Sequence, residues 1–538
     1  MNTRLMTWVV ILLLAGPAGA LANDDAFDPL LDGDDGSVLV TGVLSYMYGD
    51  PPSLDGPPRT RYLLFADDGQ EWELLVDAET LAAAGGAWRL NRQRVTVAGL
   101  ALRDDAPMIV VEALKLEDPT ADEEGARFRV SGSQRYLWIL LRFADNPSTP
   151  QQPVWFQTQA TGPAPSLDHY WREVSYNQIN LVGSDVEGWF TLPQPRSYYV
   201  YDVTPDEPGD QLDFRRAIDD AVALVDPYVY LPDYVGINLV FNGDLDGPAW
   251  GGGATINCDG VTRWYGVTYM PPWGWRWHGV LAHEMGHALG LPHSSGPYSE
   301  TYDSQWDVMS AASGTGLMSD PVYGRLGTHT IAEYKDRLSW IPTARRFVVD
   351  TTPQVVTLIQ HHAAVMPTGG ENLYVRIRRS SNSYYTVETR RQVGYDQNIP
   401  GDAVVMHLID HDITDQARVV DPDGNGDCND DGARWTPGET FADPDHGIVM
   451  TVEDVDATRS LLTFTNAART NVFVDPANVG LEDGTQTYPW NTSREGYGAV
   501  LPGGNVFIKP GTYTGQVFLV KPATLARWGS SGAVTIGP

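Results

Sequence analysis

A continuous H-E-x-x-H-x-x-G-x-x-H string runs from His283 to His293, near the middle of the chain, and constrains the fold more than any other feature. Residues four positions apart share one face of a helix, with about 5–6 Å between their Cβ atoms, so His283 and His287 can bind one ion. Glu284 is rotated by about 100° from His283. It is therefore better placed to hold a water molecule beside a metal than to bind the metal, which is the position of a general base.

The chain that follows this helix must turn back toward the metal. Gly290 comes three residues after His287, and glycine takes the left-handed conformation that ends many helices at little steric cost. Pro292 opposes helical continuation, so the turned chain can present His293 as a third ligand. Three neutral imidazoles leave the fourth tetrahedral position for water, which is typical of a catalytic zinc ion. The sequence thus predicts one catalytic Zn²⁺ whose bound water is activated by Glu284; a buried helix with hydrogen-bonded histidines is the alternative.

Three further segments accompany this zinc string, at residues 306–310 (WDVMS), 331–340 (IAEYKDRLSW) and 186–190 (VEGWF). The first resembles the Met-turn that lies beneath the zinc ion of metzincin peptidases. Together with the zinc string, the segments resemble secreted peptidases of the gametolysin and immune inhibitor A type, over about residues 130–465.

The resemblance implies a secreted metzincin-type zinc metalloendopeptidase that hydrolyses peptide bonds of extracellular proteins. It implies that His283, His287 and His293 bind the metal, that Glu284 is the general base, and that Met309 is the Met-turn residue. No tyrosine stands two positions after Met309, where some metzincins place an extra ligand or oxyanion donor, so the group that stabilises the oxyanion besides zinc stays open. The rival from another class is a catalytically silent secreted adhesin or polysaccharide-binding protein with a protease-like fold.

The composition limits the partners. The chain of 538 residues has a formal net charge of −33, which argues against nucleic acid because a polyanion would be repelled. We therefore expect protein or peptide substrates, with the acidic surface serving solubility or cation binding.

The first 22 residues have the features of a secretory signal peptide. Arg4 gives a positive start, residues 8–14 are apolar, and residues 20–22 (ALA) form a cleavage site before Asn23. No later stretch approaches 18 apolar residues, so we expect an exported, extracellular protein without a transmembrane segment.

The length favours several domains of mixed α+β class. The expected division is a signal peptide (1–22), a flexible acidic segment (23–35), a small OB-like β-barrel (36–116), a linker (117–127), a metzincin-like α/β peptidase domain (128–341), an antiparallel β-rich domain (342–468) and a partial right-handed parallel β-helix (469–538).

Five short apolar runs carry the barrel prediction, at residues 38–40, 62–65, 72–76, 95–97 and 108–111. The acidic linker is the expected site of proteolytic nicking if the barrel is removed on activation. Residues 23–257 contain no cysteine, which excludes a cysteine latch from the N-terminal region onto the zinc, whereas an aspartate or a steric latch stays open.

An alternating polar stretch in the β-rich domain resembles the first part of an EF-hand loop. The candidate calcium ligands are Asp421, Asp423, Asn425, Asp427 and Asn429, but Gly432 stands where an EF-hand has its bidentate glutamate. A Ca²⁺ site of modest affinity and a polar turn are both compatible with this pattern. Cys258 and Cys428 are the only cysteines, and an exported protein can pair them as a disulfide.

Overall fold

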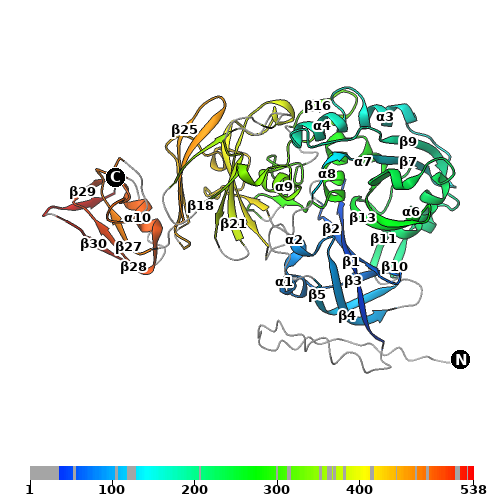
Figure 1. Ribbon diagram of the computed structural model, residues 1–538, viewed down its shortest axis with the longest axis horizontal. Coiled ribbons are helices and arrows are strands. Elements are labelled where there is room, and N and C mark those ends of the chain that lie inside the picture. The colour runs from blue at the N-terminus through cyan, green and yellow to red at the C-terminus, as the bar shows by residue number, and fades with distance from the viewer. Residues whose placement is uncertain are drawn as a thin grey trace.

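The computed structural model describes residues 36–52, 56–102, 107–117, 129–204, 207–298, 301–311, 317–349, 354–359, 366, 371–379, 383–411, 417–443, 445–466, 469–479, 484–514, 522–529 and 531–537. Within these residues the chain is multidomain and strand-rich, with few helices. Figure 1 shows the N-terminal strands packed beneath the cyan and green part of the chain, a yellow β-rich part beside it, and the C-terminal strands at the opposite end. The predicted signal peptide and most of the predicted linker lie outside the described residues.

The barrel consists of five strands that form a closed ring in the order β1-β2-β3-β5-β4. Their bounds, with those of two short helices, are β1 (Ser37–Asp50), β2 (Arg59–Ala66), β3 (Glu71–Leu75), α1 (Ala78–Ala83), α2 (Gly86–Leu90), β4 (Arg94–Leu102) and β5 (Met108–Leu116). All five predicted strands are present, so the prediction of a small closed barrel is confirmed.

The prediction of a strand at residues 38–40 is too short, because β1 continues to Asp50. Along its second half the side chains alternate between two cores. Leu44 and Tyr46 face the interior of the barrel, whereas Met47 belongs to the core of the part of the chain that follows. Strand β1 is thus shared between the two.

The central unit, residues 129–341, continues the same sheet in the order β1-β13-β14-β12-β7-β9. The strands β14, β12, β7 and β9 are parallel, and β13 is antiparallel to β14. The bounds are β6 (Gly132–Ser133), β7 (Tyr136–Arg142), α3 (Pro153–Thr161), α4 (Leu167–Val174), β8 (Ile179–Asn180), β9 (Asp185–Thr191), α5 (Arg196–Tyr199), β10 (Val200–Thr204), β11 (Glu207–Leu212), α6 (Phe214–Val225), β12 (Gly236–Phe241), β13 (Ala249–Cys258), β14 (Val261–Met270), α7 (Pro272–Trp275), α8 (His278–Ala288), β15 (Ser294–Ser295), β16 (Ser319–Asp320), β17 (Gly324–Arg325) and α9 (Ala332–Arg337).

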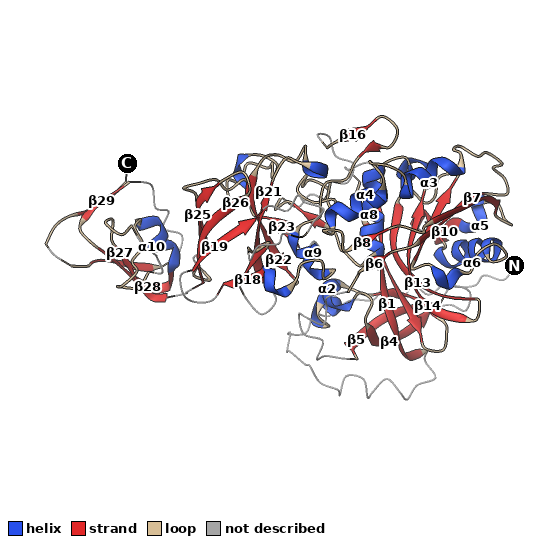
Figure 2. Ribbon diagram, turned by 45° about the horizontal axis from the view of Figure 1, so that its top comes forward, coloured by secondary structure: helices blue, strands red, loops and turns tan. Residues whose placement is uncertain are grey.

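Both faces of this sheet are covered, as expected for mainly parallel strands. On one face Leu137 and Ile139 of β7 pack with Ile218 of α6. On the other, Trp138 of β7 belongs to the core that contains Leu281 of α8. Helix α8 therefore packs against the sheet and is buried; Figure 2 shows it beside the strands of the central unit.

The third unit, residues 346–466, supplies five strands of a six-stranded sheet (β15-β23-β22-β21-β20-β18) and all of a four-stranded sheet (β19-β26-β25-β24), and the two sheets share one core. Its strands are β18 (Arg346–Val349), β19 (Gln354–Ile359), β20 (Tyr374–Arg378), β21 (Ser383–Arg390), β22 (Ala403–Asp410), β23 (Ala417–Val419), β24 (Thr440–Asp443), β25 (Ile448–Val455) and β26 (Arg459–Asn466). Strand β15 joins this sheet directly after His293, so the third unit is hydrogen-bonded to the end of the zinc string.

The C-terminal unit, residues 469–537, is built from parallel pairings. Strands β27 (Arg469–Val474), β28 (Val500–Ile508) and β30 (Ala523–Arg527) form one parallel sheet, and β29 (Gly511–Tyr513) pairs in parallel with β31 (Val534–Ile536); α10 (Ser493–Ala499) packs beside them.

No helix among the described residues combines the length and the apolarity needed to cross a bilayer.

A buried ion pair fixes the third unit to the central one. Arg390 donates from Nε and Nη2 to the two carboxylate oxygens of Asp396, each at 2.8 Å, and from Nη1 to the carbonyl oxygen of Trp306 at 2.7 Å. Arg390 and Asp396 are both fully buried. Because Trp306 begins the predicted Met-turn segment, this pair supports the floor of the predicted zinc site.

We expect Arg390→Met to lower the free energy of unfolding of this region by about 3–5 kcal/mol, because it leaves the buried Asp396 without its partner. The control is Arg459→Met, which breaks the exposed pair between Arg459 and Asp456 and should cost far less, because exposed ion pairs contribute little to stability. Urea unfolding measures both, and equal costs would contradict this account of Arg390.

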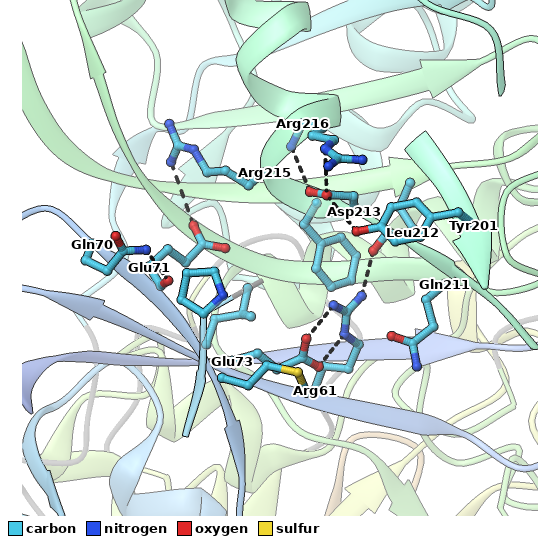
Figure 3. A pocket seen from close by; sticks show the side chains of 14 residues that line it. Arg61, Gln70, Glu71, Glu73, Tyr201, Gln211, Leu212, Asp213, Arg215 and Arg216 are labelled. Atoms are coloured by element: carbon cyan, nitrogen blue, oxygen red, sulfur yellow. Dashed lines mark hydrogen bonds and ion pairs between the residues drawn. The ribbon is translucent and has the colours of Figure 1, made fainter. Parts of the chain in front are cut away.

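A pocket of about 270 Å³ lies between the barrel and the central unit (Figure 3). Arg61 of β2 donates to the carbonyl oxygen of Leu212 at 2.7 Å and to both carboxylate oxygens of Glu73. Across the pocket, Arg215 of α6 lies 3.8 Å from the carboxylate of Glu71. Burial raises the pKa of Glu71 to about 7, which the nearby Arg215 only partly opposes.

The raised pKa of Glu71 makes the stability of the barrel depend on pH. The unfolded carboxyl has a pKa of about 4.3, so the folded state binds the proton more tightly and stability falls as pH rises from about 4.5 to 7. Arg61 and Arg215 favour the carboxylate, and Asp213 and Asp219 disfavour it.

From pH 5 to pH 8 we expect the free energy of unfolding of the barrel to fall by about 2–3 kcal/mol in the wild type. We expect no such fall in Glu71→Gln. Hydrogen exchange of β2 and β3 amides in urea measures the difference. The control is Glu112→Gln, an exposed carboxylate on β5, which should behave as the wild type does. A pH dependence that survives in Glu71→Gln would show that another group is responsible.

Candidate metal centre

Helix α8 carries the first half of the zinc string and is buried along its whole length. It can lie close to β13 because that strand has a glycine at the contact: a Cβ on Gly251 would stand 2.4 Å from the carbonyl oxygen of Glu284. The helix ends with two nested hydrogen bonds, from the amide of Gly290 to the carbonyl of His287 at 2.8 Å and from Leu291 to Gly286 at 3.0 Å. Gly290 has a φ of +101°, so the predicted glycine turn is confirmed.

The turn brings the three predicted ligands to one point. Nε2 of His287 lies 3.0 Å from Nε2 of His283 and 3.1 Å from Nε2 of His293. All three side chains are buried. Tetrahedral ligands bound at about 2.0–2.1 Å would have their nitrogen atoms about 3.3 Å apart, which is close to this spacing.

Backbone carbonyls determine which nitrogen of two of these rings faces the centre. Nδ1 of His283 lies 2.6 Å from the carbonyl oxygen of Val308, and Nδ1 of His287 lies 2.7 Å from that of Leu291. A carbonyl only accepts, so in the neutral rings Nδ1 carries the proton and Nε2 presents a lone pair. Two buried lone pairs 3.0 Å apart repel each other, and a cation between them removes that repulsion. The residues therefore fit a metal, and three imidazoles suit zinc.

The predicted Met-turn forms the floor of the centre. Met309 is fully buried, and a Cβ on Gly286 of α8 would stand 2.4 Å from its sulfur. Asp307 accepts from the amide of Met309 at 3.0 Å and from the hydroxyl of Ser294 at 2.8 Å, which ties the turn to the residue after His293. Met309 thus lies against α8 at Gly286, and its role as a Met-turn residue stays a prediction.

A carboxylate from the barrel completes the cluster. Asp50, the last residue of β1, has Oδ1 at 2.7 Å from Nε2 of His293 and Oδ2 at 3.3 Å and 3.4 Å from Nε2 of His283 and His287. Asp50, His283, His287 and His293 form one group able to hold a metal. Although burial opposes it, the histidines hold the pKa of Asp50 well below its usual range.

Sequence reasoning did not find Asp50, which precedes His293 by 243 positions. No local motif marks it: the only signal is that residues 43–48 (VLSYMY) are rich in strand-forming residue types and that two prolines follow Asp50. Its place depends on strand pairing between two units of the chain.

Glu284 stands beside this group. Its carboxylate is fully buried, and neither oxygen has a hydrogen-bond partner within the described residues. Burial, and then the charge of Asp50, raise the pKa of Glu284 well above its ordinary value. A bound cation acts in the opposite direction, because it stabilises the carboxylate.

Tyr302 also lies at the centre. Its hydroxyl donates to Oδ1 of Asp50, and its ring centroid is 5.5 Å from that of His293. The position two residues after Met309 holds no tyrosine, but here a tyrosine reaches the cluster from the segment before the Met-turn. Sequence reasoning did not identify it.

The predicted calcium ligands are only partly brought together. Asp421 and Asp423 lie with Asp430, which was not predicted, in a group whose ligand atoms are within 4.8 Å of one another. Asn425 and Asp427 accept from backbone amides two residues ahead, as in a chain of polar turns.

Asn429, the last of the predicted calcium ligands, instead links this loop to the central unit. It accepts from the amide of Gln305 at 2.8 Å and donates to the carbonyl of Asp303 at 2.6 Å. Of the five predicted ligands, Asp421 and Asp423 thus belong to the three-carboxylate group, and the Ca²⁺ assignment stays a proposal.

The two cysteines do not form a disulfide in this structure. Both are free: Cys258 ends β13 with its sulfur 3.1 Å from a carboxylate oxygen of Asp226, and Cys428 packs in a separate cluster with Trp306. The two thiols belong to different cores, so the possible disulfide is not formed in this structure.

Comparison with known proteins identifies no relative. No family profile matches the chain, and no curated protein and no solved structure matches it. The assignment of this site therefore depends on its own geometry.

We expect the purified chain to hold about one zinc ion, and His287→Ala to lose it, because removing one of three imidazoles lowers zinc affinity steeply. The control is His446→Ala, which removes a histidine that pairs with Asp443 in the third unit. Elemental analysis after gel filtration gives the metal content, and circular dichroism verifies folding. Full zinc content in folded His287→Ala would contradict the assignment.

Proposed function

We propose that the chain is a secreted zinc-dependent endopeptidase of metzincin type, similar to the gametolysin and immune inhibitor A peptidases. The observation that supports this most is the convergence of three Nε2 atoms, each on a buried ring, beside a buried glutamate whose oxygens lack partners. Export is proposed from the sequence of residues 1–22 alone.

In this proposal His283, His287 and His293 hold the zinc ion. When bound, zinc polarises the scissile carbonyl and lowers the pKa of water. Glu284 takes a proton from the attacking water and later donates it to the leaving amine.

Two other groups would act on the substrate. Tyr302 donates a hydrogen bond into the cluster, and the same hydroxyl would donate to the oxyanion that develops on the scissile carbonyl. Strand β13 runs beside α8 and would pair with an extended peptide, as sheet edges do in many peptide complexes. The substrates expected are therefore unfolded or extended protein segments.

We further propose that residues 129–341 form a metzincin-like catalytic domain, because a mainly parallel sheet with one antiparallel strand lies above the helix of the zinc string. For the C-terminal unit, the parallel pairings of β27, β28 and β30 support the first turns of a right-handed β-helix.

Hydrolysis of casein tests the function. It is measured for the wild type and for Asp50→Ala, which lacks the barrel carboxylate that contacts His293, and for each of these two chains with Glu284→Gln added. Glu284→Gln should lower the rate by about 10²–10⁴-fold, since it removes the general base, and should leave zinc in place. Removing zinc with a chelator should abolish hydrolysis reversibly. A Glu284→Gln chain as active as its parent, or folded zinc-loaded chains that all fail to cut casein, would contradict the proposal.

A further inference from the structure

Strand β1 enters the candidate active site from outside the central unit. Within the barrel it pairs with β4 over residues 37–43 and with β2 over residues 42–49. On the edge opposite β2, the last three residues, 48–50, pair antiparallel with Gly251, Trp250 and Ala249 of β13. Figure 1 shows β1 rising from the barrel toward α8. The end of β1 therefore lies on the edge of β13 that faces away from β14.

The contact between β1 and β13 is close along its length. A Cβ on Gly252 would stand 2.5 Å from the carbonyl oxygen of Tyr46, and a Cβ on Gly49 would stand 2.6 Å from the ring of Trp250. The hydroxyl of Ser45 donates to the carbonyl of Gly253 at 2.9 Å. Glycines on both strands thus allow an approach that side chains would prevent.

The same residues reach the metal ligands. The ring of Tyr48 stacks on that of His287, with centroids 4.4 Å apart and planes inclined by 19°. Asp50 places one carboxylate oxygen or the other within 3.4 Å of each of the three Nε2 atoms, and it accepts from Tyr302. A carboxylate so placed supplies the fourth ligand of a tetrahedral ion.

We propose that residues 48–50 are an autoinhibitory strand: they occupy the place of an extended substrate on β13, and Asp50 takes the position at the metal that the reaction needs. The intact chain is then a latent form. The part of this inference that concerns substrate rests on the proposed peptidase function, whereas the role of Asp50 as a ligand does not.

The fold indicates how the strand is released. Because β1 is a member of the closed barrel, residues 48–50 leave β13 together with the barrel. A cut in the predicted linker, residues 117–127, frees the barrel covalently. Contacts such as those of Arg61 with the carbonyl of Leu212 at 2.7 Å and of Arg92 with the carbonyl of Leu289 at 3.1 Å must then break before the site opens.

The test uses the full chain loaded with Co²⁺, whose visible absorption reports on its ligands without any turnover. Asp50→Ala and Asp50→Asn are compared with the wild type, all in a Glu284→Ala background to prevent self-digestion. The control is Glu112→Ala, which removes an exposed carboxylate of the same barrel. We expect the Asp50 variants alone to shift the cobalt band and to bind a casein-derived peptide at least about tenfold more tightly, because an intramolecular competitor has been removed.

A second variant tests the strand separately from the ligand. Gly49→Val keeps Asp50 but places a side chain against the ring of Trp250, so it should lift the end of β1 and change the band and the peptide affinity in the same direction. An unchanged band and unchanged peptide affinity in folded Asp50 variants overturn the proposal. Loss of cobalt from those variants also overturns it, because Asp50 would then be a permanent ligand of a closed site.

With Glu284 restored, Asp50→Ala should cut casein at least about tenfold faster than the wild type. The Asp50 variants can shift the cobalt band and bind the peptide more tightly while no form cuts casein. That result supports the autoinhibitory strand and contradicts the peptidase function. Equal cutting by the wild type and Asp50→Ala contradicts latency even if both are active.

Discussion

The repulsion between two buried imidazole lone pairs, those of His283 and His287, is the constraint on which the rest of the structure depends. Carbonyls of Val308 and Leu291 hold the Nδ1 protons of His283 and His287 away from the centre, so their Nε2 atoms meet 3.0 Å apart without a proton assigned to either. A buried arrangement of this kind needs a cation. Helix α8, its glycine turn and the Met-turn floor are the means by which the fold brings the rings together.

The second organising feature is the continuity of one strand through two units. Strand β1 closes the barrel and also extends the central sheet, so the barrel cannot be regarded as an independent appendage. Its last residue adds a carboxylate to the three histidines. The barrel thus acts on the metal centre directly, and the third unit supports the centre from the other side through Arg390 and the carbonyl of Trp306.

Local features of the site could be predicted from the sequence because they depend on spacing along one element. The pair His283 and His287 follows from the helical period, and the left-handed Gly290 follows from the residue type. The five barrel strands follow from apolar alternation. Asp50 and Tyr302 could not be predicted, because their positions depend on strand register and on a loop that folds over the helix. The calcium prediction stays a prediction: the local pattern also serves polar turns, in which Asn425 and Asp427 accept from backbone amides.

The central claim is that one zinc ion is held by three histidines of the string with an oxygen ligand from the barrel. X-ray absorption at the zinc edge on the purified full chain tests it most directly. The account predicts a first shell of nitrogen and oxygen atoms at about 2.0–2.1 Å, with the outer-shell scattering of about three imidazoles. A shell that contains sulfur at about 2.3 Å, or one without imidazole scattering, would contradict it.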